Sequence, residues 1–446
     1  MLLSKSRKEL ITYIINVVIL SFCANSFMLM RIAPITILLF VILLAFGNYI
    51  PYIKFVEFPG KRLRLCNHGV KCLSAFLISC VASGIYHLGW FLFFRPENWW
   101  NFVFSIIVCI CVEAIIFWNG IISVYLTSIQ LGIKIRVLGV IFGFVPIINL
   151  ILLFRIITVC DAECDFELEK HRLNESRKDK QICATKYPIL LVHGVFFRDI
   201  ELLNYWGRIP KELAKNGADI YYGEHESAAS IAKSAKELEK RIKWIIYDLG
   251  CEKVNIIAHS KGGLDCRYAM AHSDVSKYIA SLTTINTPHR GCLYADYLLN
   301  RISDKVQQKV ADTYNNAMLH LGDKNPDFLA AVNNLTSEYC TATFDSMLPP
   351  EGVFCQSYGS IQNKARSGKF PMNFTYHVAK PFDGPNDGLV GEYSFAFGEK
   401  CEILRTTHKR GITHEDVIDL YRENLPDFDV REFYVQMVAD LKNRGL

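Results

Sequence analysis

A serine with small neighbours is the first residue of this chain whose setting suggests chemistry. The ten residues Val254–Gly263 read VNIIAHSKGG, an apolar run that leads into Ser260 and then into a helix-forming segment. A serine in a sharp strand-to-helix turn projects its hydroxyl above the sheet, and small residues two before and two after it let strand and helix approach closely. Ala258 stands where glycine is usual but keeps that position small. The pattern predicts a nucleophilic Ser260, although the pattern alone also fits a chance serine in a turn.

A nucleophilic serine needs a base, and the base needs an orienting acid. Asp387 lies in the segment NDGLV and His414 in the segment GITHED, so the three residues follow the chain order serine, acid, histidine. An Asp-Gly pair is by itself commonly an ordinary turn. The combination with a serine and a histidine in this order predicts Asp387 as the acid and His414 as the base.

Each of these two assignments has a competitor. Asp383 is an alternative acid, four residues before Asp387. His408 is an alternative base, but it neighbours Lys409 and Arg410, whose positive charges disfavour a protonated imidazole. We therefore expect His414 to be the base.

The elements that must position these residues alternate between strands and helices. The pattern predicts, in chain order, strands at Tyr187–Val192 and Ala218–Gly223, a helix at Ala229–Leu249, a strand at Val254–Ala258, a helix at Lys261–Ala271 and a strand near Ser281–Ile285. Such alternation is typical of a mostly parallel α/β sheet with flanking helices.

Three segments together resemble the bacterial triacylglycerol lipases of the α/β-hydrolase superfamily. They are YPILLVHGVF at Tyr187–Phe196, the segment around Ser260, and INTPHRG at Ile285–Gly291. The resemblance covers roughly Tyr187 to the C-terminus and implies an α/β-hydrolase domain. It also implies an oxyanion hole formed by the backbone N–H groups of Val195 and Lys261. The side chain of His193 is expected to pack in the turn.

The resemblance raises two further questions about the site. Family members often hold a structural calcium near the histidine loop. Asp416 could supply one ligand, but no carboxylate lies between Gln356 and Phe382 to supply another, so no metal and no cofactor are expected. The family carries its lid where this chain has Cys292–Leu348. Apolar residues there could cover an acyl pocket or form an ordinary amphipathic helix; they are Ala295, Tyr297, Leu298, Leu299, Ile302, Val306 and Val310.

The N-terminal third of the chain is dominated by apolar runs long enough to cross a bilayer. The runs are approximately Leu10–Met30, Ile32–Ile53, Cys72–Phe94, Phe102–Leu126 and Val137–Ile157. We therefore expect an all-α, multi-pass transmembrane domain of about five helices at residues 1–158, a linker at 159–185 and the hydrolase domain at 186–446. A removable signal peptide fits poorly, because a second run follows the first at once.

Basic residues in the short loops predict how this domain is oriented. They precede the first run and lie between the second and third and between the fourth and fifth; they are Lys5, Arg7, Lys8, Lys54, Lys61, Arg62, Arg64, Lys71, Lys134 and Arg136. The other loops hold Arg31 and Arg95. The positive-inside rule places the N-terminus in the cytoplasm, and five spans then place the catalytic domain outside the cell membrane. If two adjacent runs form a re-entrant pair, the side reverses.

The cysteines and one acidic residue each permit more than one interpretation. Nine of the 15 cysteines lie in or just before the soluble domain, and an odd number favours a reducing or oxygen-poor setting, or a cytoplasmic domain. Cys160 and Cys164 have metal-like spacing but lack a second pair, so no zinc site is expected. Glu113 lies in the fourth run and is either functional or neutral and packed between helices.

Taken together, these patterns predict a membrane-anchored serine ester hydrolase that acts on lipid esters through an acyl-enzyme. An acyltransferase or thioesterase would use the same residues, and a non-catalytic membrane sensor with a hydrolase-like domain is a third possibility. The net charge of +5 is small for 446 residues and no basic stripe accompanies it, so no nucleic-acid partner is expected.

Overall fold

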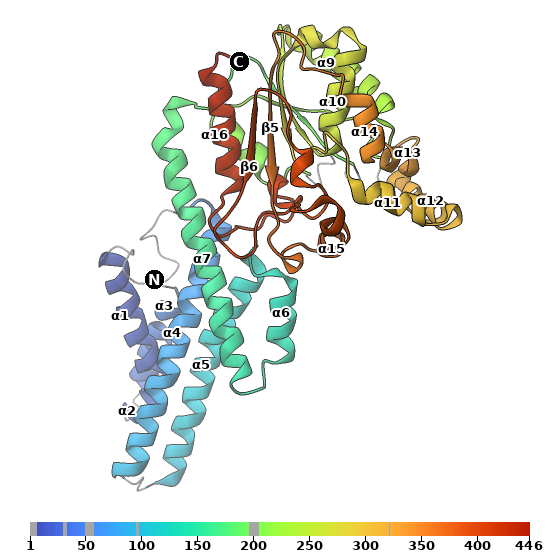
Figure 1. The fold of residues 1–446 in the computed structure, drawn as a ribbon. Coiled ribbons are helices and arrows are strands. Elements are labelled where there is room, and N and C mark those ends of the chain that lie inside the picture. Colours follow the sequence, from blue (N-terminus) through green and yellow to red (C-terminus); the bar gives the residue numbers. More distant parts are fainter. Residues whose placement is uncertain (1–6, 30–33, 50–57, 95–97, 196–204, 321) are drawn as a thin grey trace. The chain divides into compact units, whose positions relative to one another are not determined.

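The computed structural model describes residues 7–29, 34–49, 58–94, 98–195, 205–320 and 322–446. Its contacts divide the chain into two compact units, Met1–Glu175 (unit 1) and Ser176–Leu446 (unit 2) (Figure 1). Each unit is described by itself below.

Unit 2 is built on a six-stranded sheet with the order β2-β1-β3-β4-β5-β6, in which every neighbouring pair is parallel. The strands are β1 (Ile189–Val192), β2 (Ile220–Tyr222), β3 (Val254–His259), β4 (Ile279–Ile285), β5 (Phe354–Ser360) and β6 (Lys400–Leu404). Four of these strands were predicted from the sequence and are confirmed. Because the strands are parallel, their carboxyl ends meet at one edge of the sheet, where β3 leads into Ser260.

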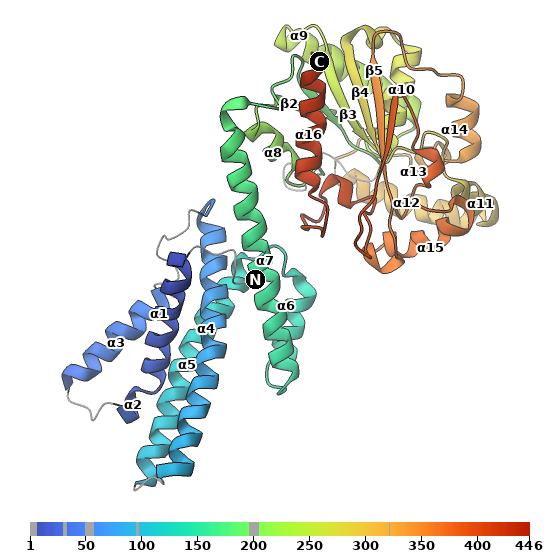
Figure 2. The same cartoon turned by 60° about the vertical axis from the view of Figure 1, so that its left-hand side comes forward.

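Helices cover both faces of this sheet (Figure 2). Helices α8 (Ile209–Lys215) and α16 (Val430–Asn443) contribute to one core, and α9 (Ile231–Leu249) and α10 (Lys261–His272) to the other. The strand β1 reads ILLV, and all four of its residues are buried, alternately in one core and the other. A strand covered on both faces is apolar throughout for this reason, and each buried aliphatic side chain stabilises the fold by about 2 kcal/mol.

The rest of unit 2 follows β4 and β5. Helices α11 (Leu293–Arg301), α12 (Asp304–His320), α13 (Phe328–Asn333) and α14 (Ser337–Phe344) form the long insertion between these strands, and α15 (Met372–Asp383) follows β5. The insertion is therefore mostly helical. The sequence analysis did not identify β5 or β6.

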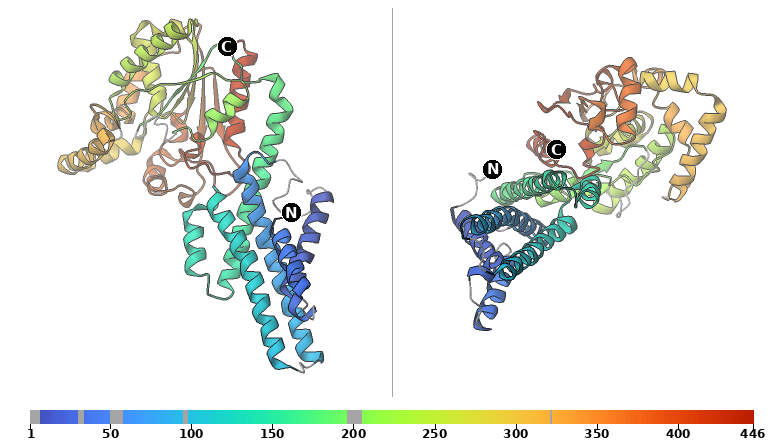
Figure 3. Two further views of the ribbon diagram at one scale, coloured as in Figure 1. Left: turned by 180° about the vertical axis from the view of Figure 1, so that it is seen from behind. Right: turned by 90° about the horizontal axis from the view of Figure 1, so that it is seen from below.

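Unit 1 is all-α. Its helices are α1 (Arg7–Ala24), α2 (Ser26–Leu29), α3 (Pro34–Tyr49), α4 (Lys61–Gly89, continued by a π-helix at Trp90–Phe94), α5 (Trp99–Thr127), α6 (Gly132–Ile141) and α7 (Ile148–Arg177). Figure 3 shows α1, α4 and α5 running side by side, and α1 contacts both α3 and α4. Among the residues that the structure describes, two stretches, Lys61–Phe93 and Trp99–Thr127, are long and apolar enough to cross a membrane, and two shorter helices are apolar. Length and composition alone are weak evidence for spans, because a buried core helix can pass the same test.

The fifth apolar run is not a single helix, so the prediction that it forms one spanning helix is wrong. Helix α6 ends at Ile141, turns follow, and α7 begins at Ile148. Gly143 and Pro146 lie in this break, and proline lacks the N–H that a continuous helix needs and clashes with the preceding turn. The side chain of Asn149 donates to the Gly143 carbonyl at 2.6 Å, which satisfies a backbone group left free by the break. Residues 159–177 of the predicted linker belong to α7.

Candidate active site

Ser260 occupies the sharp turn between β3 and α10 that its sequence predicts. Its φ of 54° and ψ of −131° lie in a region that non-glycine residues rarely adopt, and its N–H donates to the Ile285 carbonyl on β4 at 2.9 Å. Strain of this kind costs about 1–3 kcal/mol and persists where the surrounding structure holds it. A Cβ at Gly262 would lie 2.4 Å from the His193 carbonyl oxygen, so only glycine allows this approach.

The predicted acid, Asp387, and the predicted base, His414, contact each other through both side chains and backbone. His414 Nδ1 lies 2.6 Å from Asp387 Oδ2, and the His414 N–H donates to the Asp387 carbonyl at 2.8 Å. The His414 ring also lies against His259, the residue before Ser260, with 4.5 Å between ring centroids. Nδ1 faces the Asp387 carboxylate, so Nε2 is the nitrogen left without this partner.

Four donors hold the Asp387 carboxylate in place, and one of them was missed by the sequence analysis. Oδ1 accepts from the backbone N–H groups of Leu389 and Val390 at 2.8 and 2.7 Å. Oδ2 accepts from His414 and from Asn286 Nδ2, the latter at 2.7 Å. Asn286 directly follows β4 in the INTPHRG segment, and its position at a strand's carboxyl end was a usable signal.

The two competing residues lie in other surroundings. Asp383 accepts hydrogen bonds from the N–H groups of Leu293 and Tyr294 at the start of α11, at 2.9 and 3.2 Å. Its carboxylate therefore fixes the start of that helix. His408 is exposed and accepts from the Arg410 N–H at 3.2 Å. Neither residue joins Asp387 and His414.

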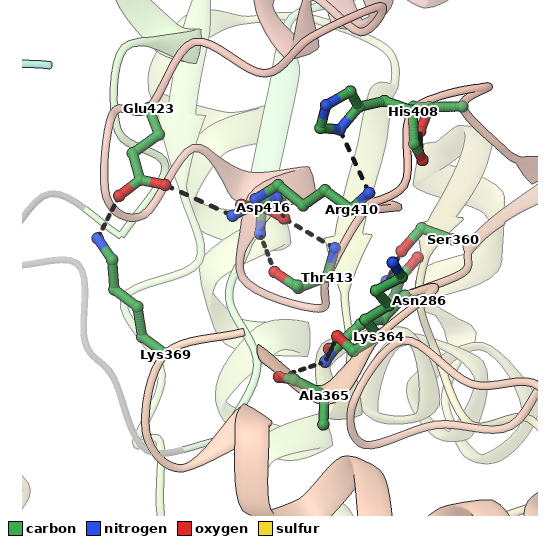
Figure 4. Close-up of polar contacts among 12 residues, drawn as sticks. Asn286, Ser360, Lys364, Ala365, Lys369, His408, Arg410, Thr413, Asp416 and Glu423 are labelled. Carbon is green, nitrogen blue, oxygen red and sulfur yellow. Dashed lines mark hydrogen bonds and ion pairs between the residues drawn. The ribbon is translucent and has the colours of Figure 1, made fainter. Parts of the chain in front are cut away.

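The Asp416 carboxylate is held by a cation of the protein itself (Figure 4). It pairs with the Arg410 guanidinium and accepts from the Thr413 N–H at 2.8 Å. Arg410 also contacts Glu423 at 3.4 Å, and Lys369 pairs with the same glutamate at 2.5 Å. This network braces the loop that carries His414. In the described parts of the chain, no group of three or more His, Cys, Asp or Glu residues is arranged to hold a metal ion.

The two expected oxyanion donors, Val195 and Lys261, belong to segments that adjoin Ser260. A Cβ at Gly194 would lie 2.8 Å from the Ser260 Cβ, so the segment that leads into Val195 passes directly beside Ser260. Lys261 is the first residue of α10, where backbone N–H groups lack partners within the helix. Residues 196–204, which follow Val195, lie outside the described chain.

The Tyr205 hydroxyl connects the loop at Gly194 with His259, the residue before Ser260. It accepts from the Gly194 N–H at 2.9 Å and lies 2.6 Å from His259 Nδ1. Complete burial and the neighbouring His414 hold the pKa of His259 well below its ordinary value. His259 is therefore neutral, and it serves as a hydrogen-bonded support between the Gly194 loop and the base.

The Lys261 side chain is buried away from the reacting groups. Its Nζ lies 2.7 and 3.0 Å from the two oxygens of Asp265 and 3.1 Å from Ser234 Oγ. Burial raises the pKa of Asp265 to about 6, against the lowering effect of Lys261. The side chain thus anchors α10 beneath the turn, while the backbone N–H remains available for the oxyanion role.

The insertion between β4 and β5 carries apolar side chains on its surface. Tyr297, Val306 and Val310 are 42, 50 and 45% exposed, whereas Ala295 is buried. This distribution is compatible with both predicted roles for the segment, a cover for an acyl pocket or an ordinary amphipathic surface.

Comparison with known proteins gives the following matches. A lipase of Vibrio cholerae is 29% identical over 289 residues, which cover 59% of this chain and 89% of the relative. A lipase of Pseudarthrobacter phenanthrenivorans is 31% identical over 182 residues, or 38% of this chain and 56% of the relative. The chain thus spans little more than half the length of the second relative. Both relatives are described as triacylglycerol lipases. No family model matches.

Solved structures also match this part of the chain. A lipase from Bacillus licheniformis in mature form is 23% identical, covers 53% of this chain and 87% of its own, and has a TM-score of 0.40. A metagenomic carboxyl esterase is 12% identical, covers 58% of this chain and 76% of its own, and has a TM-score of 0.46. The sequence relatives, together with the parallel sheet and the helices on both of its faces, support a bacterial lipase family with an α/β-hydrolase fold for unit 2.

Proposed function

We propose that the protein is a membrane-anchored serine ester hydrolase, a lipase or carboxylesterase that acts on lipid esters. The observation that carries the proposal is the junction of His414 with Asp387 beside the strained turn of Ser260. A histidine with one nitrogen held by a fully buried carboxylate has the tautomer needed to take a proton through the other nitrogen.

The mechanism is acyl transfer through a covalent intermediate. His414 Nε2 takes the proton of Ser260 as its oxygen attacks the ester carbonyl, and the backbone N–H groups of Val195 and Lys261 stabilise the oxyanion. His414 then gives the proton to the departing alcohol. Water, activated by the same histidine, releases the carboxylic acid and restores the serine.

The class of substrate is inferred from the relatives and from the anchor. The relatives are triacylglycerol lipases, and an apolar anchor would keep the site near lipid. Thioesters, or transfer to an alcohol in place of water, would use the same residues. Product analysis with and without an added alcohol distinguishes hydrolysis from transfer.

The test uses Ser260→Ala in the full-length protein. The variant should lose ester hydrolysis and covalent labelling by a fluorophosphonate probe, because the attacking oxygen is gone, while it keeps its thermal unfolding midpoint. His408→Ala, which changes an exposed residue outside the site, is the matched control and should label normally. A Ser260→Ala variant that still labels at full strength would remove this serine from the mechanism, and an unlabelled native protein would favour the non-catalytic sensor.

For the anchor we propose four membrane crossings, by α1, α3, α4 and α5, and a re-entrant hairpin formed by α6 and α7. Helix α6 has 10 residues and extends about 15 Å, half of a bilayer core. The break that follows it exposes large apolar side chains, and Phe144 is 97% exposed. If the break is the tip of a hairpin that enters the bilayer and leaves it on the same side, these apolar side chains contact lipid and avoid water.

This count reverses the orientation expected from five spans. With the basic loops on the cytoplasmic side, four crossings return the chain to the cytoplasm before unit 2 begins. A cytoplasmic unit 2 also suits its cysteines, which are all free in the structure and need no oxidising surroundings.

The orientation is tested by adding protease to intact cells. Unit 2 should survive and should be digested only after the membrane is permeabilised. A reporter domain fused after Leu446 gives an independent readout with the same expected side. If protease digests unit 2 in intact cells, the chain crosses the membrane a fifth time and unit 2 lies outside the cytoplasm.

A further inference from the structure

Unit 1 contains a cavity of about 570 Å³ that the proposed hydrolysis does not use. Its wall is formed by α4, α5, Gly143 in the α6–α7 break and the first turns of α7. The wall is mostly apolar, with Phe76, Ile106, Ile110, Phe117, Trp118 and Leu153 among the lining residues. The volume lies within the range of cavities that hold one small ligand. An apolar cavity of this size needs a polar group to select and orient a ligand.

Glu113 supplies such a group. The residue is 6% exposed and lines the cavity from α5. Its Oε1 accepts from Ser79 Oγ at 2.6 Å, whereas Oε2 has no hydrogen-bond partner within the described residues. Cys80, a weak thiol donor, lies on the same wall. A buried carboxylate oxygen without a strong donor is unfavourable, and a ligand that donates a hydrogen bond would relieve this.

The other polar groups of the wall are already engaged. His87 Nδ1 lies 2.9 Å from the Ser83 carbonyl, and its Nε2 lies 3.1 Å from Ser105 Oγ. The Asn149 amide donates to Gly143 as described above. Within the described residues, the cavity therefore offers an apolar surface and a buried hydrogen-bond acceptor that lacks a partner, Glu113 Oε2.

The depth of Glu113 along α5 excludes some classes of ligand. It is the middle residue of α5, about 21 Å from either end of that helix. In a spanning helix this depth excludes phosphate or other charged head groups, which stay at the interface. Fully esterified lipids contain no donor for Oε2. A lipid with a hydrocarbon chain and a free hydroxyl satisfies both the apolar wall and the acceptor.

We propose that this cavity binds a single-chain lipid whose free hydroxyl donates to Glu113, with the chain lying between Phe76 and Trp118. Either a long-chain alcohol or a monoacylglycerol has this chemistry. The site differs from the Ser260 site in residues and in unit, and binding requires no bond to be made or broken.

The test measures quenching of Trp118 fluorescence in the full-length protein in detergent. The probes are 9,10-dibromostearyl alcohol, its methyl ether, which lacks the donor, and the monoacylglycerol with the same brominated chain, tested in a Ser260→Ala background to prevent hydrolysis. We expect saturable quenching with about a tenfold preference for the alcohol over the ether, because the ether leaves the buried Glu113 oxygen without a hydrogen-bond donor. The chain has six tryptophans, so the saturable part of the quenching is assigned to Trp118 by its loss in Trp118→Phe. If the monoacylglycerol binds more tightly than the alcohol, the natural ligand carries its hydroxyl on a glycerol head group.

Two variants test the site itself. Glu113→Leu should remove the preference for the alcohol. Ala114→Phe keeps the carboxylate but fills the cavity and should abolish quenching, whereas Ile122→Phe, on the exposed side of the same helix, should not. Equal binding of alcohol and ether by the native protein, or unchanged quenching in Ala114→Phe, would overturn the proposal. Because these readouts are binding measurements, they do not depend on whether Ser260 is catalytic.

Discussion

Replacement of Asp387 by asparagine tests the proposed acid most directly. The aspartate accepts two hydrogen bonds on each oxygen, from backbone N–H groups on Oδ1 and from Asn286 and His414 on Oδ2. Asparagine offers one oxygen and one NH₂. If the oxygen stays with the two backbone donors, the NH₂ must face His414 Nδ1, which then acts as an acceptor and carries its proton on Nε2.

The magnitude of the effect follows from this change of tautomer. An imidazole protonated on Nε2 cannot accept the proton of Ser260, and the loss of the correct tautomer in such a site lowers kcat by about 10⁴, or about 5.5 kcal/mol of barrier. KM should change little, because no substrate contact is removed. Stability should fall by about 2 kcal/mol, the usual value of a hydrogen bond to a charged group.

The assay is steady-state hydrolysis of a soluble short-chain ester, with thermal unfolding as the check on folding. Asp383→Asn is the matched control, because it makes the same chemical change four residues away, in a carboxylate that holds the start of α11. It should reduce stability and leave kcat within about threefold. If Asp383→Asn loses activity while Asp387→Asn keeps it, the assignment of the acid is wrong.

Two further predictions concern neighbouring residues. His414→Ala should lower kcat by several orders of magnitude with a small change in KM, whereas His408→Ala should be nearly silent; an inactive His408 variant would show that the base is assigned to the wrong histidine. Burial raises the pKa of Glu415 from 4.5 to about 7, so the folded protein binds more protons than the unfolded chain in this range, and stability should fall as the pH rises from about 4.5 to 7. Glu415→Gln should therefore unfold at a higher temperature than the native protein at pH 8, and the difference should vanish near pH 4.5; a constant difference would mean that this carboxyl does not titrate as described.

The sequence alone predicted the elements whose patterns are local. Strands β1 to β4 and helices α9 and α10 have runs of apolar residues at strand or helix spacing, and their ends fall within a few residues of the prediction. Ser260 was found for the same reason, since a strained turn between strand and helix depends on the few residues around it. Strand β6 was missed because residues 400–404 are largely exposed and do not form an apolar run.

Tertiary structure decided the features that depend on residues far apart in the chain. Asn286 and Asp387 are 101 positions apart, and they meet because β4 and the following loops end at the same edge of a parallel sheet. The partner of Asp416 is Arg410, a pairing that no local sequence pattern indicated. The fifth apolar run has enough hydrophobic residues for a span, but the backbone at 142–147 turns back. Hydrophobicity fixes which residues avoid water, whereas backbone hydrogen bonds and packing fix the path that the chain takes to bury them.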